Sequence, residues 1–191
     1  VTGGQVIFHD TGSRDANGKS TQSLVIRNGS LWAHRSSNTE DANLVKVEAG
    51  SVSMENSTFL ANPNGSIQLG SDSNPLTSFV LDRQQPSVGN SNGAIVARGG
   101  SIEINAENTS ISTSNIDYAI LATSVDVSNT PTSDDSYQNK TSQININSGN
   151  LTVNGNIGAT PTSYNTKQDI TNDTKAPIGM SQIINLNTTG K

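Results

Sequence analysis

The sequence predicts an all-β chain built from short, repeated strands, and two observations support this. Ser, Asn, Thr and Gly make up 88 of the 191 residues, whereas the residues that propagate helices are scarce. The apolar residues, mostly Ile, Val and Leu, alternate with polar ones, and this period of two is typical of strands with one buried face. A helix-rich fold is therefore excluded.

A repeated pattern surrounds several glycines. In each copy, apolar residues stand five and three positions before the glycine and two and four positions after it. The clearest copies are centred on Gly29, Gly50, Gly100 and Gly149. The sixteen apolar positions are Leu24, Ile26, Leu31, Ala33, Val45, Val47, Val52, Met54, Ile95, Ala97, Ile102, Ile104, Ile144, Ile146, Leu151 and Val153. The pattern predicts two half-buried strands that meet at a tight corner.

The spacing of the copies predicts how these strands are arranged. Weaker copies are centred on Gly4 and Thr123, one is expected around Phe79–Val88, and most steps are 21–26 residues. A sandwich would show turns roughly every 8–12 residues, whereas the observed step suits three short strands and three corners. We therefore expect a right-handed parallel β-helix of about seven to eight coils with projecting loops, as a single domain spanning 1–191.

Two finer features follow from this arrangement. The third strand of each coil is expected to hold Phe59, Ile111 and Ile157. Asparagines near the corner after the second strand suit left-handed backbone geometry and stacked amide hydrogen bonds. These residues are Asn56, Asn105, Asn129 and Asn154. An amide ladder is one interpretation of them, and the other is that 24 asparagines must fall somewhere.

Segments rich in Pro, Gly, Asp, Ser and Thr are expected to project as loops. They lie near 62–75 (Asn62–Gly65 and Ser71–Pro75), 84–92, 129–141 and 160–177. Binding residues concentrate on loops that a rigid scaffold displays, although insertions without a partner are equally compatible. Asp134, Asp135 and Tyr137, in the 129–141 loop, are candidate binding residues.

A second candidate binding surface surrounds the single tryptophan. Trp32 occupies an outward-facing position beside Arg27 and His34. An aromatic ring there suits stacking on a carbohydrate or contact with a protein, and it would equally suit a place beneath a loop. Val25 and Val96 are the other apolar residues at outward positions of the pattern.

The sequence predicts no catalytic residue, metal or cofactor. A glycosidase needs two carboxylates about 5–9.5 Å apart, but the adjacent acidic pair, Asp134–Asp135, lies in a loop. Asp82-Arg83 resembles a lyase site only weakly. A serine triad needs a histidine and a carboxylate, and neither His9 nor His34 has that context. The chain has no cysteine and no cluster of histidines that would ligate a metal.

Charge and hydropathy limit the possible partners. The net charge is −5 and the Lys and Arg residues are scattered singly, so nucleic acid is not an expected partner. No run approaches the roughly 18 apolar residues of a membrane span, and no signal layout begins at Val1. We expect a mature protein, or a piece of one, that is not embedded in a membrane.

The segments Gly93–Asn105, Thr109–Thr113 and Tyr118–Ala122 resemble coils of pertactin-like autotransporter passengers. In repeat style the resemblance covers Ser23–Val153. These proteins of Gram-negative bacteria are exported through their own outer-membrane barrel and often act as adhesins. The resemblance implies a non-enzymatic adhesin, at the bacterial cell surface or secreted, that binds a host protein or glycan or associates with other bacteria. Since no translocator barrel is present, the chain would be part of a longer passenger, and since no Arg-Gly-Asp motif occurs, its adhesive target stays open.

Three alternatives stay open. Asn62-Pro63-Asn64-Gly65-Ser66-Ile67 is similar to the Asn-Pro-Asn-Gly-Ile element of two-partner-secreted haemagglutinin-type exoproteins, although a serine intrudes and a simple turn would explain it. A polysaccharide-active β-helix enzyme and a phage fibre are the other two.

Overall fold

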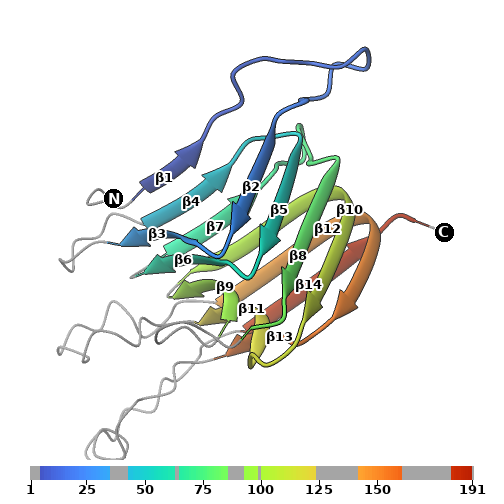
Figure 1. Cartoon of the computed structure of the whole chain (residues 1–191). Coiled ribbons are helices and arrows are strands. Elements are labelled where there is room, and N and C mark those ends of the chain that lie inside the picture. Colours follow the sequence, from blue (N-terminus) through green and yellow to red (C-terminus); the bar gives the residue numbers. More distant parts are fainter. Residues whose placement is uncertain are drawn as a thin grey trace, which may run out of the picture.

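The computed structural model describes residues 5–34, 43–62, 65–85, 93–98, 100–123, 142–160 and 182–190. In these ranges every regular element is a strand, and the paired strands all run parallel. Figure 1 shows that the sheets curl around a common interior. The prediction of an all-β chain is confirmed.

The strands form three series, each stacked along one side of the molecule (Figure 1). The first series comprises β1 (Gln5–Phe8), β4 (Asn43–Val47), β7 (Gly65–Leu69), the first halves of β10 (Ser101–Thr113) and β12 (Ser142–Asn154), and β14 (Gln182–Thr188). The second comprises β2 (Ser23–Arg27), β5 (Ser51–Glu55), β8 (Ser78–Arg83) and the second halves of β10 and β12. The third comprises β3 (Ser30–His34), β6 (Thr58–Asn62), β9 (Gly93–Arg98), β11 (Tyr118–Thr123) and β13 (Ile157–Thr160).

The two long strands, β10 and β12, join the first and second series into a single sheet. Because β10 and β12 each run through the first and second series without a break, these series form one nine-stranded sheet. The third series is a separate five-stranded sheet.

The chain visits the three series in the same order five times, and β14 begins a sixth circuit. The described residues therefore hold fewer circuits than the expected seven to eight. The error lies in the assumed length of a circuit. Ile67 follows its partner Val45 by 22 positions, but Ile144 follows its partner Ile102 by 42.

The predicted number of circuits was wrong because the glycine pattern occurs at all three kinds of corner. Gly50 and Gly149 lie between the first and second series, Gly29 between the second and third, and Gly100 between the third and first. Steps between these glycines therefore do not measure one circuit. For the same reason the expected third strand is only partly right. Phe59 and Ile157 belong to the third series, whereas Ile111 lies in the second half of β10.

Inward-facing residues of successive circuits form aliphatic columns. Two columns of the first series are Val6, Val45, Ile67, Ile102, Ile144 and Ile184, and Phe8, Val47, Leu69, Ile104, Ile146 and Leu186. Twelve of the sixteen pattern positions are buried, and the other four are Ile26, Leu31, Leu151 and Val153. Each buried aliphatic side chain contributes about 1.5–3 kcal/mol relative to exposure. The expectation that Ile95 and Ile144 point inward is confirmed.

The corners are tight, as the glycines predict. A β-carbon at Gly50 would collide with the carbonyl of Ser20, and one at Gly149 would meet the carbonyl of Glu107 at 2.5 Å. Each of these glycines thus lies against the corner of the preceding circuit. Three corners between the second and third series instead use left-handed asparagines, with φ of 51° at Asn28, 45° at Asn56 and 59° at Asn115.

Amide ladders run along the outside of the nine-stranded sheet. Asn187 donates its Nδ2 to Oδ1 of Asn147 (2.7 Å), and Asn147 donates likewise to Asn105 (2.7 Å). Two shorter ladders join Asn185 to Asn145 and Asn150 to Asn108, both at 2.8 Å.

Of the asparagines expected in a ladder, Asn105 alone is confirmed. Asn56 accepts a hydrogen bond from the Gln84 backbone N–H (3.1 Å), and Asn154 lies within β12 opposite Ser112. Asn129 lies outside the described residues. A ladder needs equivalent positions on neighbouring circuits, and the expected set mixed different corners.

The expected loops coincide only in part with what is described. Near 62–75, Ser71 and Asn74 form a turn with mutual backbone hydrogen bonds of 3.2 Å, but β7 lies between the two expected loop segments. The loops at 129–141 and 160–177, and the one at 84–92 beyond residue 85, fall outside the described residues apart from Thr160, which ends β13.

Candidate functional site

The structure places the predicted Trp32 surface on two different sheets. Arg27 ends β2 in the nine-stranded sheet, whereas Trp32 and His34 belong to β3 in the five-stranded sheet. The corner at Asn28–Gly29 separates them, so they do not share a strand face. Arg27 donates from Nε to Oε2 of Glu55 (2.9 Å) across neighbouring circuits. The side chains of this pair are 69% and 51% exposed, so the ion pair contributes little stability.

Trp32 lies at one end of an apolar stripe on the outside of the five-stranded sheet. Its cross-strand neighbours are successively Leu60, Val96 and Leu121. These four residues, with Tyr118, are called the outer stripe below. Leu60, Val96 and Leu121 are buried and form a second small hydrophobic cluster, whereas Trp32 is 49% exposed. The stripe therefore presents its accessible aromatic surface at the first circuit.

Two glycines make room within the outer stripe. A β-carbon at Gly158 would collide with the Tyr118 ring, so this ring lies directly over the glycine. A β-carbon at Gly93 would approach Val96 Cγ2 to 3.0 Å. Val96 and Trp32, which the sequence places at outward positions, therefore belong to one stripe of cross-strand neighbours, of which Val96 is buried and Trp32 is half-exposed.

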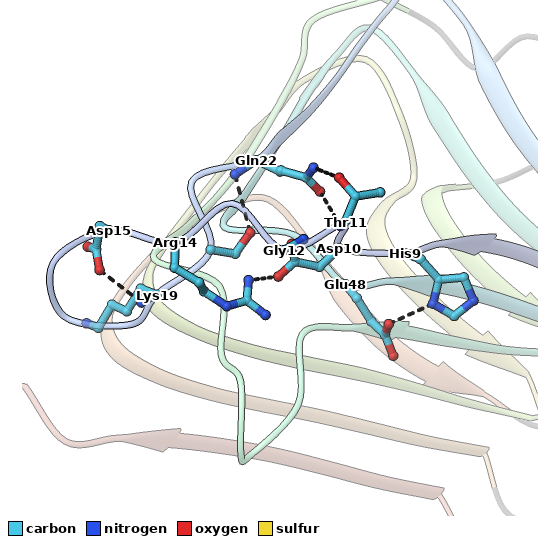
Figure 2. A network of polar contacts seen from close by, with 10 residues as sticks. His9, Asp10, Thr11, Gly12, Arg14, Asp15, Lys19, Gln22 and Glu48 are labelled. Atoms are coloured by element: carbon cyan, nitrogen blue, oxygen red, sulfur yellow. Dashed lines mark hydrogen bonds and ion pairs between the residues drawn. The ribbon is translucent and has the colours of Figure 1, made fainter.

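Residues 9–22, the N-terminal loop, join β1 to β2 and were not predicted to project. Figure 2 shows their polar network. Asp10 accepts a hydrogen bond from the Gly12 backbone N–H (2.9 Å) and pairs with Arg14. Arg14 and Ser20 form an antiparallel bridge, which makes the tip a small hairpin. The signal available in the sequence was a stretch with a single apolar residue, Ala16, between Phe8 and Leu24.

Asp15 organises the tip of the N-terminal loop. Its Oδ1 accepts the backbone N–H groups of Lys19 (2.9 Å) and Asn17 (2.8 Å). These hydrogen bonds, that from Lys19 foremost, lower the pKa of the Asp15 carboxyl because they stabilise its charged form. The tip thus has a defined backbone, and it exposes charged side chains.

The base of the N-terminal loop is tied to the second circuit. The Gln22 carbonyl accepts the N–H groups of Gly50 (2.8 Å) and Ser51 (3.1 Å). His9 Nδ1 lies 3.0 Å from Glu48 Oε2, and Lys46 pairs with the same carboxylate (Figure 2 shows the His9 contact). The hydrogen bond from Lys46, and next that from His9, lowers the pKa of Glu48.

Further along the side of the stack, Lys19 pairs with Glu107 of β10. The loop therefore contacts several circuits, and its charged side chains are displayed from a fixed base.

Asp82 and Arg83, which weakly resemble a lyase site, lie on opposite faces of β8. Arg83 continues the inward positions of Phe79 and Leu81 on β8 and is 2% exposed. Its Nη1 donates to the carbonyl of Ser57 (3.0 Å) and to Thr58 Oγ1, and burial lowers its pKa. Asp82, on the opposite face of the strand, is exposed and accepts from Gln84 Nε2 (2.7 Å). The two side chains therefore do not converge.

The other three predicted binding residues, Asp134, Asp135 and Tyr137, lie outside the described residues. Among the residues that are described, no three His, Cys, Asp or Glu side chains gather in a way that could hold a metal ion. The same residues include no helix of the length and apolarity needed to cross a membrane.

Comparison with models of known families, with curated proteins and with solved structures finds no match for this chain.

Proposed function

We propose that the chain is a right-handed parallel β-helix, forming a single domain of a bacterial surface-exposed or secreted passenger, and that it acts as a non-enzymatic adhesin. The observation that carries the proposal is the division between inside and outside. In the described residues, aliphatic columns fill the interior, while the outside carries amide ladders, the charged N-terminal loop and an exposed aromatic ring. Such a scaffold displays surface groups at fixed positions, as a binding protein requires.

Trp32 and the N-terminal loop are the proposed contact points with a host protein or glycan. The half-exposed indole ring offers a flat apolar face that suits a sugar ring or an apolar protein surface. The N-terminal loop offers charged groups at the same circuit, on a base tied to Gly50. Association with other bacteria is the alternative target of the same surfaces.

Binding of labelled protein to host cells and to bacteria tests the proposal. We expect Trp32→Ala, or replacement of Asp15–Lys19 by two glycines, to reduce binding by about tenfold or more, the loss of one good contact. Val25→Ala is the matched control, because Val25 is an equally exposed apolar residue on the other sheet. Equal binding by all variants would refute the proposed contact points.

Shortening residues 129–141 tests the candidates Asp134, Asp135 and Tyr137 in the same assay, with loss of binding as the expected result. The enzyme alternative is tested separately. Incubation with acidic polysaccharides should release neither reducing nor unsaturated ends. Turnover abolished by Asp82→Ala or Asp134→Ala would overturn the adhesin assignment.

A further inference from the structure

We propose that Asn17, at the tip of the N-terminal loop, is a site of spontaneous deamidation and backbone isomerisation with water as the co-reactant. The residue that follows it is Gly18. The reaction needs neither an enzyme nor a binding partner, so the inference goes beyond the proposed adhesin function and does not depend on it.

The reaction proceeds through a cyclic imide. The backbone nitrogen of Gly18 loses its proton to hydroxide and attacks Cγ of Asn17. The N–Cγ bond forms, the Cγ–Nδ2 bond breaks and ammonia leaves. Water then opens the ring, and cleavage at Cγ gives aspartate, whereas cleavage at the main-chain carbonyl carbon gives isoaspartate. The sum is hydrolysis of an amide to a carboxylate and ammonia, without oxidation or reduction. A following glycine hinders the attack least because it has no β-carbon.

The structure distinguishes between the Asn-Gly pairs of the chain. Attack requires the peptide plane between the two residues to turn until the glycine nitrogen reaches Cγ. A pair held by neighbouring strands must first separate from them, and such opening costs more free energy in packed elements than in exposed loops. The described residues hold three complete pairs, Asn17-Gly18, Asn28-Gly29 and Asn154-Gly155, whereas Asn64 and Asn92 of the other two pairs lie outside them.

The tip of the N-terminal loop leaves room for this rotation. Residues 11–18 are all exposed, and a β-carbon at Gly18 would meet no heavy atom within 4 Å apart from its chain neighbours. The Gly18 N–H donates to the carbonyl of Asp15 (3.0 Å). Because this hydrogen bond is exposed, water can replace it, and the net cost of breaking it is small. Asn17 therefore reaches the attacking geometry by a local motion of the turn.

Asn28 lies in a corner that is fixed to the second circuit. Its N–H donates to the carbonyl of Glu55 (3.0 Å), and the attacking Gly29 N–H donates to Oγ of the buried Ser57 (3.3 Å). The Gly29 carbonyl accepts the N–H of Thr58 (3.0 Å). Rotation at this pair therefore requires the corner to separate from the circuit beside it.

Asn154 is held by the strand ladder. It is the last residue of β12 and lies opposite Ser112 of β10. A β-carbon at Gly155 would collide with the side chain of Thr113 and would lie 3.4 Å from Cβ of Ala119. The peptide plane that has to turn is thus packed against the preceding circuit, so we expect this pair to react slowly as well.

Isomerisation would change the turn at the tip. Oδ1 of Asp15 accepts the N–H groups of Asn17 (2.8 Å) and Lys19 (2.9 Å), and Figure 2 shows the contact with Lys19. Isoaspartate inserts a methylene group into the backbone between these two N–H groups, so they can no longer reach the same oxygen. The same hydrogen bonds lower the pKa of the Asp15 carboxyl, and the new carboxylate adds a negative charge beside it. The reaction should therefore raise the pKa of Asp15.

Peptide mapping by mass spectrometry after incubation at neutral and mildly alkaline pH tests the proposal. In the folded protein we expect Asn17 to deamidate at least about tenfold faster than Asn28 and Asn154, at a rate that rises with pH because the deprotonated nitrogen attacks. The chain unfolded in denaturant is the matched control. Since all three asparagines precede glycine, their rates should become similar there. Equal rates in the folded protein, or a difference that persists on unfolding, would overturn the proposal.

NMR titration of the incubated protein tests the consequence for the tip. We expect a higher pKa of Asp15 in the fraction that is isomerised at position 17. Asn17→Gln should stay unmodified and keep the original pKa, because attack on glutamine needs a larger ring. Asn28→Gln is the control, since it leaves the reacting pair intact and should change on incubation as the parent chain does. An equal change of the Asp15 pKa in Asn17→Gln would contradict the assignment.

Discussion

Arg83 donates a hydrogen bond from Nη1 to the backbone carbonyl of Ser57 over 3.0 Å, inside the stack and almost out of reach of water. The contact joins β8 of the third circuit to the corner between β5 and β6 of the second circuit. A charged donor thus serves as a structural link between circuits.

Arg83→Met should destabilise the protein by about 1–3 kcal/mol, because methionine retains part of the packing and leaves the carbonyl of Ser57 without this donor. Denaturant unfolding measures the effect. Arg27→Met is the control, since the exposed Arg27–Glu55 pair should change stability by only about 0.5 kcal/mol or less. Similar losses in both variants would contradict a specific role for the buried guanidinium.

Gly50→Ala should destabilise by about 1–3 kcal/mol, the usual cost of overpacking, because the new methyl group would collide with the carbonyl of Ser20. In Gly29→Ala the methyl would meet Ile26 Cγ2 at 3.5 Å, an ordinary contact, so a smaller loss is expected. Thermal and chemical unfolding of both variants check the difference. A neutral Gly50→Ala would show that the corner relaxes easily.

Asn147→Ala removes the middle member of the longest amide ladder and with it two side-chain hydrogen bonds. At about 0.5–1.5 kcal/mol each, the expected loss is about 1–3 kcal/mol. Asn154→Ala, in the same strand but outside the ladders, should be close to neutral. A double-mutant cycle with Asn105→Ala isolates the coupling, and a coupling energy near zero would mean that the amides do not support one another.

Glu48 should contribute stability at neutral pH that disappears in acid. Its folded-state pKa is lowered, so the contribution is present above the unfolded pKa and is lost as the pH falls through the folded pKa. NMR titration of the Glu48 carboxyl should show a higher pKa in Lys46→Met, and a smaller rise in His9→Ala, because Lys46 is the larger cause. An unchanged titration in Lys46→Met would contradict this assignment.

The sequence predicted which side chains face inward, but it did not predict the number of circuits. Alternation placed Ile95 and Ile144 inside correctly, because period two is a local property of a strand. The number of circuits was wrong because Gly50 and Gly100 share a local pattern but occupy different corners. Only the pairing between strands distinguishes such corners, and pairing is not a local property.

Of the candidate site, the sequence could predict the direction in which a side chain faces, but not which residues of different circuits become neighbours. The outward positions of Trp32 and Val96 followed from alternation, but their continuity through Leu60 and Leu121 depends on register between circuits. Burial of Arg83 follows from the alternation of Phe79 and Leu81, although arginine is rarely buried completely.

The connections from the third series back to the first vary widely in length. Two residues separate β6 from β7 and β9 from β10, but 18 separate β11 from β12 and 21 separate β13 from β14. The strands on either side nevertheless keep the same register, with Ile144 on Ile102 and Ile184 on Ile144. Connector length is therefore independent of the order within the stack. This corner offers a place where foreign peptides can be grafted, and where evolution can replace one segment by another, without redesign of the core.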